Sequence, residues 1–210
     1  MKELDLLKKD WNKNTHTFEQ VPEREIYGMI HKKSSSIVKW ILVISLLEFL
    51  LWISVNTIFN ADDYLEKIAQ SELIVFFKTL TFLNYGVVLF FIYLFYKNYT
   101  AISTTVATKE LMKAILKTKK IVQYYVWYNL GMVCFSFILG IIITFAYNPE
   151  ISNLKTQNAN YGMVMGITTV VLLVVLVVIL GLFWLFYKLI YGLLLNRLYK
   201  NYKELEKVEL

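Results

Sequence analysis

Apolar residues along this chain gather into four long blocks that are separated by polar and charged segments. The blocks lie at about residues 37–59, 73–96, 121–147 and 163–190. Each approaches or exceeds the roughly 20 residues that an α-helix needs to cross ~30 Å of hydrocarbon. A soluble domain of this length would instead show amphipathic periods broken by polar turns. The pattern therefore predicts an all-α integral membrane protein with four transmembrane helices.

The polar segments beside these blocks are expected to be helical as well. Residues 1–36 form a charged N-terminal segment that is too short to bury a core of its own. Residues 97–120 contain no glycine or proline, and from Thr105 onward they read as an amphipathic helix that runs into the third span. Residues 191–210 continue the fourth span as a charged helical tail. We therefore expect a transmembrane bundle over residues 37–190 with helical extensions on one side.

Basic residues are distributed very unevenly between the two sides of the predicted bundle. Nineteen of the 22 lysines and arginines fall within residues 1–39, 97–120 and 188–210. The two other loops carry one lysine each. The positive-inside rule then places both termini and the middle loop in the cytoplasm. The net charge of +6 thus indicates anionic lipid headgroups as a partner, and not nucleic acid.

Groups that support catalysis or hold a cofactor are scarce in this sequence. The two histidines, His16 and His31, have no cysteine pair near them, and the single cysteine, Cys134, lies in the third span. Structural and catalytic metal sites need several such ligands together. The phosphate-binding and nucleophile motifs are absent too. We therefore expect no catalytic residues, no metal and no cofactor, and a protein that is not an enzyme.

The first span carries a carboxylate, Glu48, at its predicted midpoint. A charged carboxylate at the centre of a bilayer costs at least about 2.5–3.5 kcal/mol on insertion scales. Glu48 is therefore expected to face the other helices and to be protonated or hydrogen-bonded. Other polar residues of the spans are predicted to form an intramembrane polar cluster with it, namely Ser45, Asn56, Lys78, Asn84 and Asn129.

Within this cluster, Asn84 is expected at the level of Glu48 and is the predicted hydrogen-bond partner. Lys78 should lie ~10 Å nearer the outside and extend toward that surface. Three interpretations of Glu48 remain open. It fixes which helix faces meet, as interhelical hydrogen bonds do. Alternatively it carries a proton or binds a ligand, or it lies at a different depth from the one assumed.

Small residues suggest how the third and fourth spans associate, because the fourth span has no ionisable or amide group near its centre. Such residues recur at intervals of four and let helix backbones approach closely. They all fall in the outer half of the bilayer, where we expect the two spans to pack closest: Ser136, Gly140, Thr144, Gly162 and Gly166. The alternative is that the same motif joins two copies of the chain into a homo-oligomer.

The N-terminal segment carries two short apolar stripes at helical spacing. The first comprises Leu4, Leu7 and Trp11. The second follows Pro22, a typical helix start, and comprises Ile26, Met29 and Ile30. Such stripes fit a helix that lies on the membrane surface. They also fit a helix that docks onto a cytosolic protein.

Three phrases of the sequence resemble a group of small four-pass inner-membrane proteins of flavobacterial (Bacteroidetes) type. They are "ELDLLKKDW", "EIYGMIHKKSSSIVKWILVISLLEFLLW" and "LMKAILKTKKIVQYYVWYNL". Some members of this group are thought to lie beside sigma-factor genes. The resemblance implies a membrane-held regulator whose N-terminal segment binds a sigma factor, although the His/Cys cluster of zinc-containing anti-sigma proteins is missing here.

Two functions remain open at this point. The first is a non-enzymatic regulator or scaffold that presents cytoplasmic helices to a protein partner. The second is a small transporter or channel subunit that uses the Glu48-centred polar site.

Overall fold

The computed structural model describes residues 22–59, 71–105, 107–147 and 161–209, and these are almost entirely helical. The helices are α2 (Glu23–Phe59), α4 (Ser71–Thr104), α5 (Thr108–Tyr147) and α7 (Tyr161–Tyr187), which continues through the π-helical turn η1 (Lys188–Gly192) into α8 (Leu193–Glu209). Four helical stretches are long and apolar enough to cross a membrane. The predicted all-α class and its four long apolar helices are therefore confirmed.

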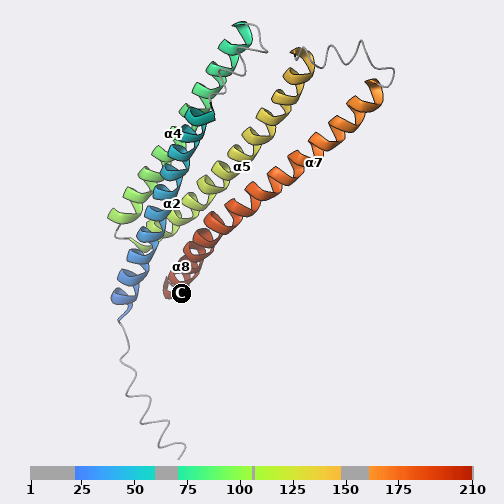
Figure 1. The fold of residues 1–210 in the computed structure, drawn as a ribbon. Helices are drawn as coiled ribbons and strands as arrows, with labels where there is room; N and C mark the ends of the chain where they lie inside the picture. Colours follow the sequence, from blue (N-terminus) through green and yellow to red (C-terminus); the bar gives the residue numbers. More distant parts are fainter. Residues whose placement is uncertain (1–21, 60–70, 106, 148–160, 210) are drawn as a thin grey trace, which may run out of the picture.

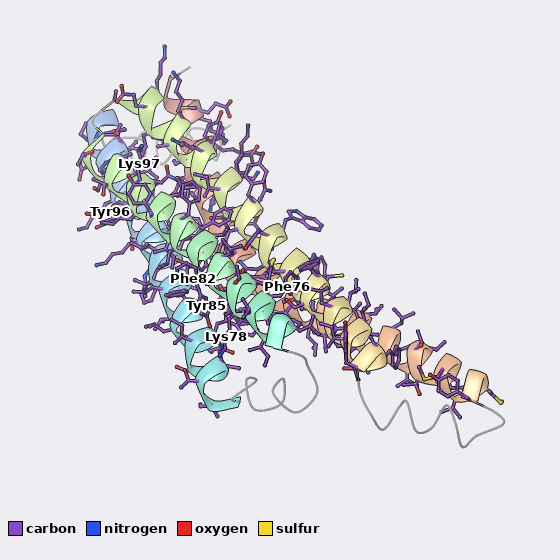
Figure 2. All side chains as sticks on the ribbon, turned by 90° about the horizontal axis from the view of Figure 1, so that it is seen from above. Phe76, Lys78, Phe82, Tyr85, Tyr96 and Lys97 are labelled. Atoms are coloured by element: carbon purple, nitrogen blue, oxygen red, sulfur yellow. The ribbon has the colours of Figure 1, made fainter. Side chains whose placement is uncertain are left out.

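The helices lie with their ends at two levels (Figure 1). At one level α2 begins, α4 ends, α5 begins and α8 ends; we call this the basic end, because most lysines lie there. We call the opposite level the far end. Figure 2 shows Lys97 and Lys78 toward the two ends of α4. α2 packs against α4 and α8, and α5 packs against α4, α7 and α8.

α2 runs unbroken from the N-terminal segment into the first predicted span. It begins directly after Pro22, whose carbonyl oxygen accepts hydrogen bonds from the amides of Glu25 (2.8 Å) and Ile26 (3.2 Å). Proline favours this position because its fixed φ suits the first turn and it lacks an N–H. Residues 23–59 form one continuous helix, whereas a helix lying along the membrane surface would leave the direction of the first span. This continuity favours an extension of the first span, and the surface helix stays a prediction.

The helical extensions pack against one another at the basic end. Their shared core comes from α2, α4, α5 and α8 and consists of Ile30, Val38, Ile102, Leu111, Ile115, Leu198 and Leu205. Ile26 packs against this core, whereas Met29 is exposed. The stripe that was expected to dock onto another protein is thus used mostly inside the chain, because α8 and α5 cover it. The stripe of Leu4, Leu7 and Trp11 lies outside the described residues.

Two polar contacts complete this basic-end bundle. The side-chain amide of Asn201 donates a hydrogen bond to the hydroxyl of Ser34 (3.0 Å), and both residues are buried. The hydroxyl of Tyr27 donates to the carbonyl oxygen of Thr105 (3.4 Å), next to the turn between α4 and α5. Burial raises the pKa of Tyr27 above its ordinary value, so the phenol stays protonated as a donor. These contacts tie α8 to α2 and tie α2 to the turn between α4 and α5.

The predicted close contact between α5 and α7 near the far end is not formed. A Cβ atom added to Gly140, Gly162 or Gly166 would meet nothing within 4 Å, Ser136 is exposed and Thr144 is half-buried. In Figure 1, α7 diverges from α2 and α4 toward the end that carries Tyr161. Small residues permit close approach but supply little attraction of their own. The prediction is therefore wrong within one chain, and contact between two copies stays a prediction.

We expect Leu198→Ala to lower the free energy of unfolding by about 2–5 kcal/mol, because it leaves a cavity in a filled core. Leu198 is fully buried between helices. The matched control is Leu193→Ala on the same helix, where the side chain is 57% exposed. Unfolding of the two variants in a denaturing-detergent titration tests this, and equal losses would show that α8 does not pack as described.

Candidate functional site

Glu48 accepts hydrogen bonds from three tyrosine hydroxyls. Tyr125 of α5 donates to Oε2 at 2.9 Å, and Tyr191 of η1 donates to the same oxygen at 3.2 Å. Tyr187, the last residue of α7, donates to Oε1. All three tyrosines are buried. One carboxylate thus joins α2 to both α5 and the α7–η1 junction, and we call these four residues the Glu48 cluster.

The tyrosine rings are positioned by one another and by a local change of helix geometry. Tyr187 and Tyr191 are stacked with their centroids 5.9 Å apart, and the π-helical turn begins directly after Tyr187. The Tyr125 ring meets Tyr191 (5.9 Å) and Phe95 (5.5 Å) edge-on. Edge-to-face and offset-stacked rings at these separations attract each other. Single π-helical turns are often found at functional sites, which makes the α7–η1 junction a candidate functional element.

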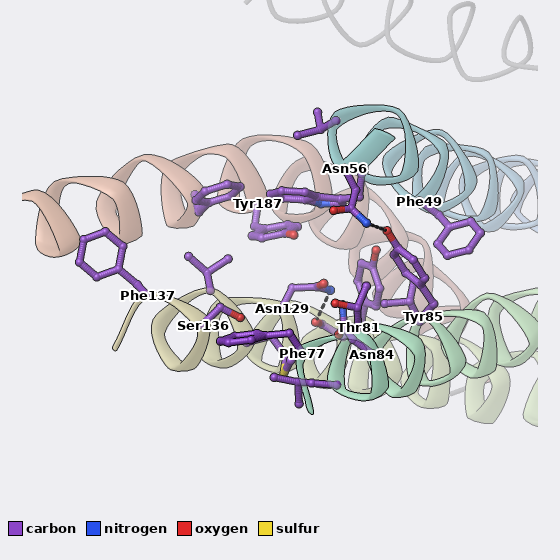
Figure 3. Close-up of a pocket in the computed structure, with 18 residues that line it drawn as sticks. Phe49, Asn56, Phe77, Thr81, Asn84, Tyr85, Asn129, Ser136, Phe137 and Tyr187 are labelled. Atoms are coloured by element: carbon purple, nitrogen blue, oxygen red, sulfur yellow. Dashed lines mark hydrogen bonds between the residues drawn. The ribbon is translucent and has the colours of Figure 1, made fainter. Parts of the chain in front are cut away.

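A cavity of about 590 Å³ lies on the far-end side of the Glu48 cluster, between α2, α4, α5 and α7 (Figure 3). Tyr125 and Tyr187 belong both to the cluster and to the lining of this pocket. Its aromatic walls include Phe49, Trp52, Phe77, Phe137 and Phe183. Its polar lining consists of Asn56, Thr81, Asn84, Tyr85, Asn129 and Ser136. Its volume falls within the roughly 300–1,000 Å³ typical of small-molecule sites.

Several polar groups of the pocket are fixed by hydrogen bonds. The amide of Asn56 donates to the Tyr85 hydroxyl (3.2 Å), which joins α2 to α4. The Tyr128 hydroxyl donates to Oδ1 of Asn84 (2.9 Å), which joins α5 to α4. The amide of Asn129 donates to the backbone carbonyl of Tyr125 (2.9 Å) in its own helix. Figure 3 shows Asn84, Thr81 and Asn129 pointing into the pocket.

The predicted polar cluster is therefore formed in part. Asn56, Asn84 and Asn129 gather around the pocket, whereas Ser45 is buried and donates to the carbonyl oxygen of Leu42 in its own helix (2.9 Å). Lys78 is exposed and lies seven residues, about 10 Å, beyond Tyr85 toward the far end. The prediction that Asn84 is the partner of Glu48 is wrong, because the tyrosines occupy both carboxylate oxygens.

The level of Glu48 relative to α5 and α7 follows from its partners. Along α5 its partner Tyr125 lies five residues, about 7 Å, past Lys120. Along the fourth helix, Tyr187 directly precedes Lys188, and Tyr191 follows it. Glu48 therefore lies toward the basic end of α5 and α7, whereas along α2 it lies nine residues, about 13 Å, past Lys39. Its depth in a bilayer stays a prediction.

Sequence reasoning missed the three tyrosines. Tyrosine is common at lipid–water boundaries, so a tyrosine near the end of an apolar helix does not by itself indicate a partner for a buried carboxylate. A signal was present, because Tyr187 and Tyr191 are four residues apart on a mostly aliphatic helix. Buried tyrosine hydroxyls normally find a partner, and Glu48 is the carboxylate of the first span. Matching phenols to that carboxylate would have pointed to the cluster.

The lining of the pocket is uncharged among the residues that the structure describes. It contains no lysine, arginine, aspartate or glutamate of that part of the chain. Among the described residues, no group of three or more metal-ligating side chains lies together. The carboxylate that lies beside the pocket is covered on the pocket side by Tyr125 and Tyr187. The site thus offers hydrogen bonds and apolar walls.

Comparison with known families places this geometry in context. The chain belongs to the family described as a domain of unknown function (DUF8845), whose model matches residues 24–210. The match begins at the second residue of α2 and includes every described helix. No curated protein and no solved structure matches the chain.

We expect Glu48→Ala to lower the free energy of unfolding by about 2 kcal/mol, since three interhelical hydrogen bonds are worth roughly 0.6 kcal/mol each. Glu48→Gln keeps an acceptor oxygen and should cost less than half as much. Unfolding in a denaturing-detergent titration compares the two variants. Equal losses, or no loss for Glu48→Ala, would contradict the role given to the cluster.

Proposed function

We propose that this chain is a non-enzymatic, ligand-responsive regulator of a bacterial inner membrane. Its four apolar helices span the bilayer with the basic end in the cytoplasm, as the positive-inside rule favours. The pocket binds a small amphiphilic molecule within the membrane. The basic-end bundle changes its packing in response and presents the altered surface to a cytosolic protein.

The observation that supports this proposal is that Tyr125 and Tyr187 belong both to the pocket and to the Glu48 cluster. Both side chains line the pocket, and both donate a hydrogen bond to Glu48. A molecule that displaces either ring therefore also weakens the link between α2 and the α7–η1 junction. Binding and helix packing are then coupled through shared atoms, which is the differential contact that a ligand-driven change requires.

The path from the pocket to the basic end is short and continuous in the chain. Tyr187 is followed by η1 and then by α8, whose Leu198, Asn201 and Leu205 pack in the basic-end bundle. A π-helical turn holds one residue more per turn than an α-helix, so its conversion to α-helix would rotate α8 relative to α7. We take η1 to be the element with two arrangements, since coupling needs such an element.

The partner-facing surface would be the outside of the basic-end bundle. Exposed basic side chains there come from several helices and include Lys113, Lys117, Lys200 and Lys203. Such a surface suits an acidic cytosolic protein and disfavours a basic one; a sigma factor remains one candidate. Because Ile26 and Ile30 belong to the bundle, a deletion that tests partner capture should remove residues 1–21 and leave α2 whole.

A small transporter or channel subunit is the second candidate, and the pocket beside a carboxylate favours it. Under this alternative, Glu48→Gln abolishes flux of the transported species in proteoliposomes while the fold is kept. The regulator is preferred because Glu48 is shielded from the pocket by two tyrosines. A proton or cation path would need further titratable groups in sequence.

The regulator can be tested without knowing its ligand, by filling the pocket with a side chain. Ser136 lines the pocket, so the indole of Ser136→Trp should take up pocket volume that a ligand would otherwise occupy. We expect amide hydrogen exchange of residues 193–209 in lipid nanodiscs to accelerate about tenfold, which corresponds to the loss of two or three interhelical hydrogen bonds.

The matched control is Phe135→Trp, one residue away on the lipid-facing side, where the phenylalanine is 45% exposed and does not line the pocket. Its exchange in α8 should stay at the level of the unchanged protein. If Ser136→Trp also leaves α8 unchanged while tryptophan is accommodated in the pocket, occupancy does not reach the basic end and the regulator proposal is wrong.

A further inference from the structure

We infer that the pocket binds the ring of an isoprenoid quinone or of its quinol form. This inference rests on the proposed function, because it names the class of ligand for the same site. It is carried by four features of the pocket: the uncharged lining among the described residues, the mixed donors and acceptors, the aromatic side chains and the position along the helices.

The charge of the lining excludes most membrane ligands. Among the described residues, no lysine, arginine, aspartate or glutamate lines the pocket. A phosphate headgroup or a cationic amphiphile would therefore lose its hydration there without an opposite charge in return. A simple hydrocarbon chain would leave the remaining donors and acceptors of the pocket, such as the hydroxyls of Thr81 and Ser136, without partners, which is costly as well. An uncharged molecule with a few polar atoms satisfies both conditions.

The hydrogen-bonding groups offer both donors and acceptors. Oδ1 of Asn84 accepts from Tyr128, which leaves its amide hydrogens to donate. Tyr85 accepts from Asn56 and keeps its own hydroxyl hydrogen. Among the described residues, the hydroxyls of Thr81 and Ser136 make no hydrogen bond. These donors suit the two carbonyl oxygens of a quinone.

Acceptors are present for the reduced form as well. Asn129 lines the pocket, and because its amide nitrogen donates to its own helix, its Oδ1 is left as an acceptor. Oδ1 of Asn56 is likewise left as an acceptor, because the amide nitrogen of Asn56 donates its hydrogen bond to Tyr85. The hydroxyls of a quinol would donate to such oxygens. A site with both kinds of group retains either form of the ring.

Shape and depth agree with a planar ring on an apolar tail. Trp52 of α2 and Phe183 of α7 both line the pocket, and their rings are stacked with an interplanar angle of 21°, so they offer aromatic surface to a planar ring. Asn129 lies nine residues, about 13 Å, past Lys120, which is near the middle of a ~30 Å hydrocarbon layer. Phospholipid headgroups stay at the surface, whereas an uncharged ring on a lipid tail enters this region at little cost.

Tryptophan fluorescence tests the inference, because quinones quench indole emission. In the test protein Trp11, Trp40, Trp127 and Trp184 are changed to Phe, so that Trp52 alone reports on the pocket. In the matched control Trp127 is kept instead, since it is 71% exposed and does not line the pocket. Both are titrated in lipid nanodiscs with a benzoquinone that carries a ten-carbon alkyl tail.

We expect quenching of Trp52 to saturate at a low ratio of quinone to protein, while quenching of Trp127 rises linearly with quinone in the bilayer. Thr81→Val, which keeps the side-chain shape, together with Asn84→Leu should raise the half-saturating ratio about tenfold through the loss of hydrogen bonds. Thr81→Val alone should give a smaller increase in the half-saturating ratio. This single variant keeps the test valid if the double variant does not fold.

Two results would overturn the inference. Linear quenching of Trp52 like that of Trp127 would show that the probe only partitions into lipid. Saturable quenching that both pocket variants leave unchanged would show that the ring does not use these polar groups. In either case the regulator proposal is kept if Ser136→Trp still accelerates hydrogen exchange in α8. It is wrong if Ser136→Trp leaves that exchange unchanged, whatever the quenching experiment shows.

Discussion

A carboxylate that lies among apolar helices must find hydrogen-bond donors, and this requirement shapes the whole chain. Glu48 meets it with three phenols, which come from α5, from the end of α7 and from η1. An unpaired carboxylate in such surroundings would cost several kilocalories per mole. The hydrogen bonds therefore fix α2, α5 and α7 at this point, both in rotation about their axes and in position along the bundle. The pocket on one side and the basic-end bundle on the other both take their positions from it.

The two sides of the Glu48 cluster differ in packing. Toward the basic end, side chains of four helices fill the space, with fully buried residues such as Val38, Ile102 and Leu198. Toward the far end, α7 leaves α2 and α4, and the space between the helices is the 590 Å³ pocket. A tight bundle joined to an open one through shared tyrosines can respond to what enters the open part. This asymmetry is the physical basis of the proposed regulator.

Much of the fold was predictable because helix formation depends on local patterns. The four apolar blocks, the helix start after Pro22 and the amphipathic extension before the third span all follow from composition and periodicity. The relative levels of the helices do not, because each helix continues beyond its apolar block, so block midpoints do not mark a common plane. The partners of Glu48 were missed for the same reason. Gly162 and Gly166 were overvalued because small residues permit contact without requiring it.

The central claim is that the Glu48 cluster transmits changes in the pocket to α8. A double-mutant cycle tests it directly, with Glu48→Ala, Tyr187→Phe and their combination compared by hydrogen exchange of residues 193–209 in nanodiscs. The account predicts that each single change accelerates exchange and that the double variant is no faster than Glu48→Ala alone, because both remove the same link. Rates in which the two effects simply multiply would show that Glu48 and Tyr187 act separately and would contradict it.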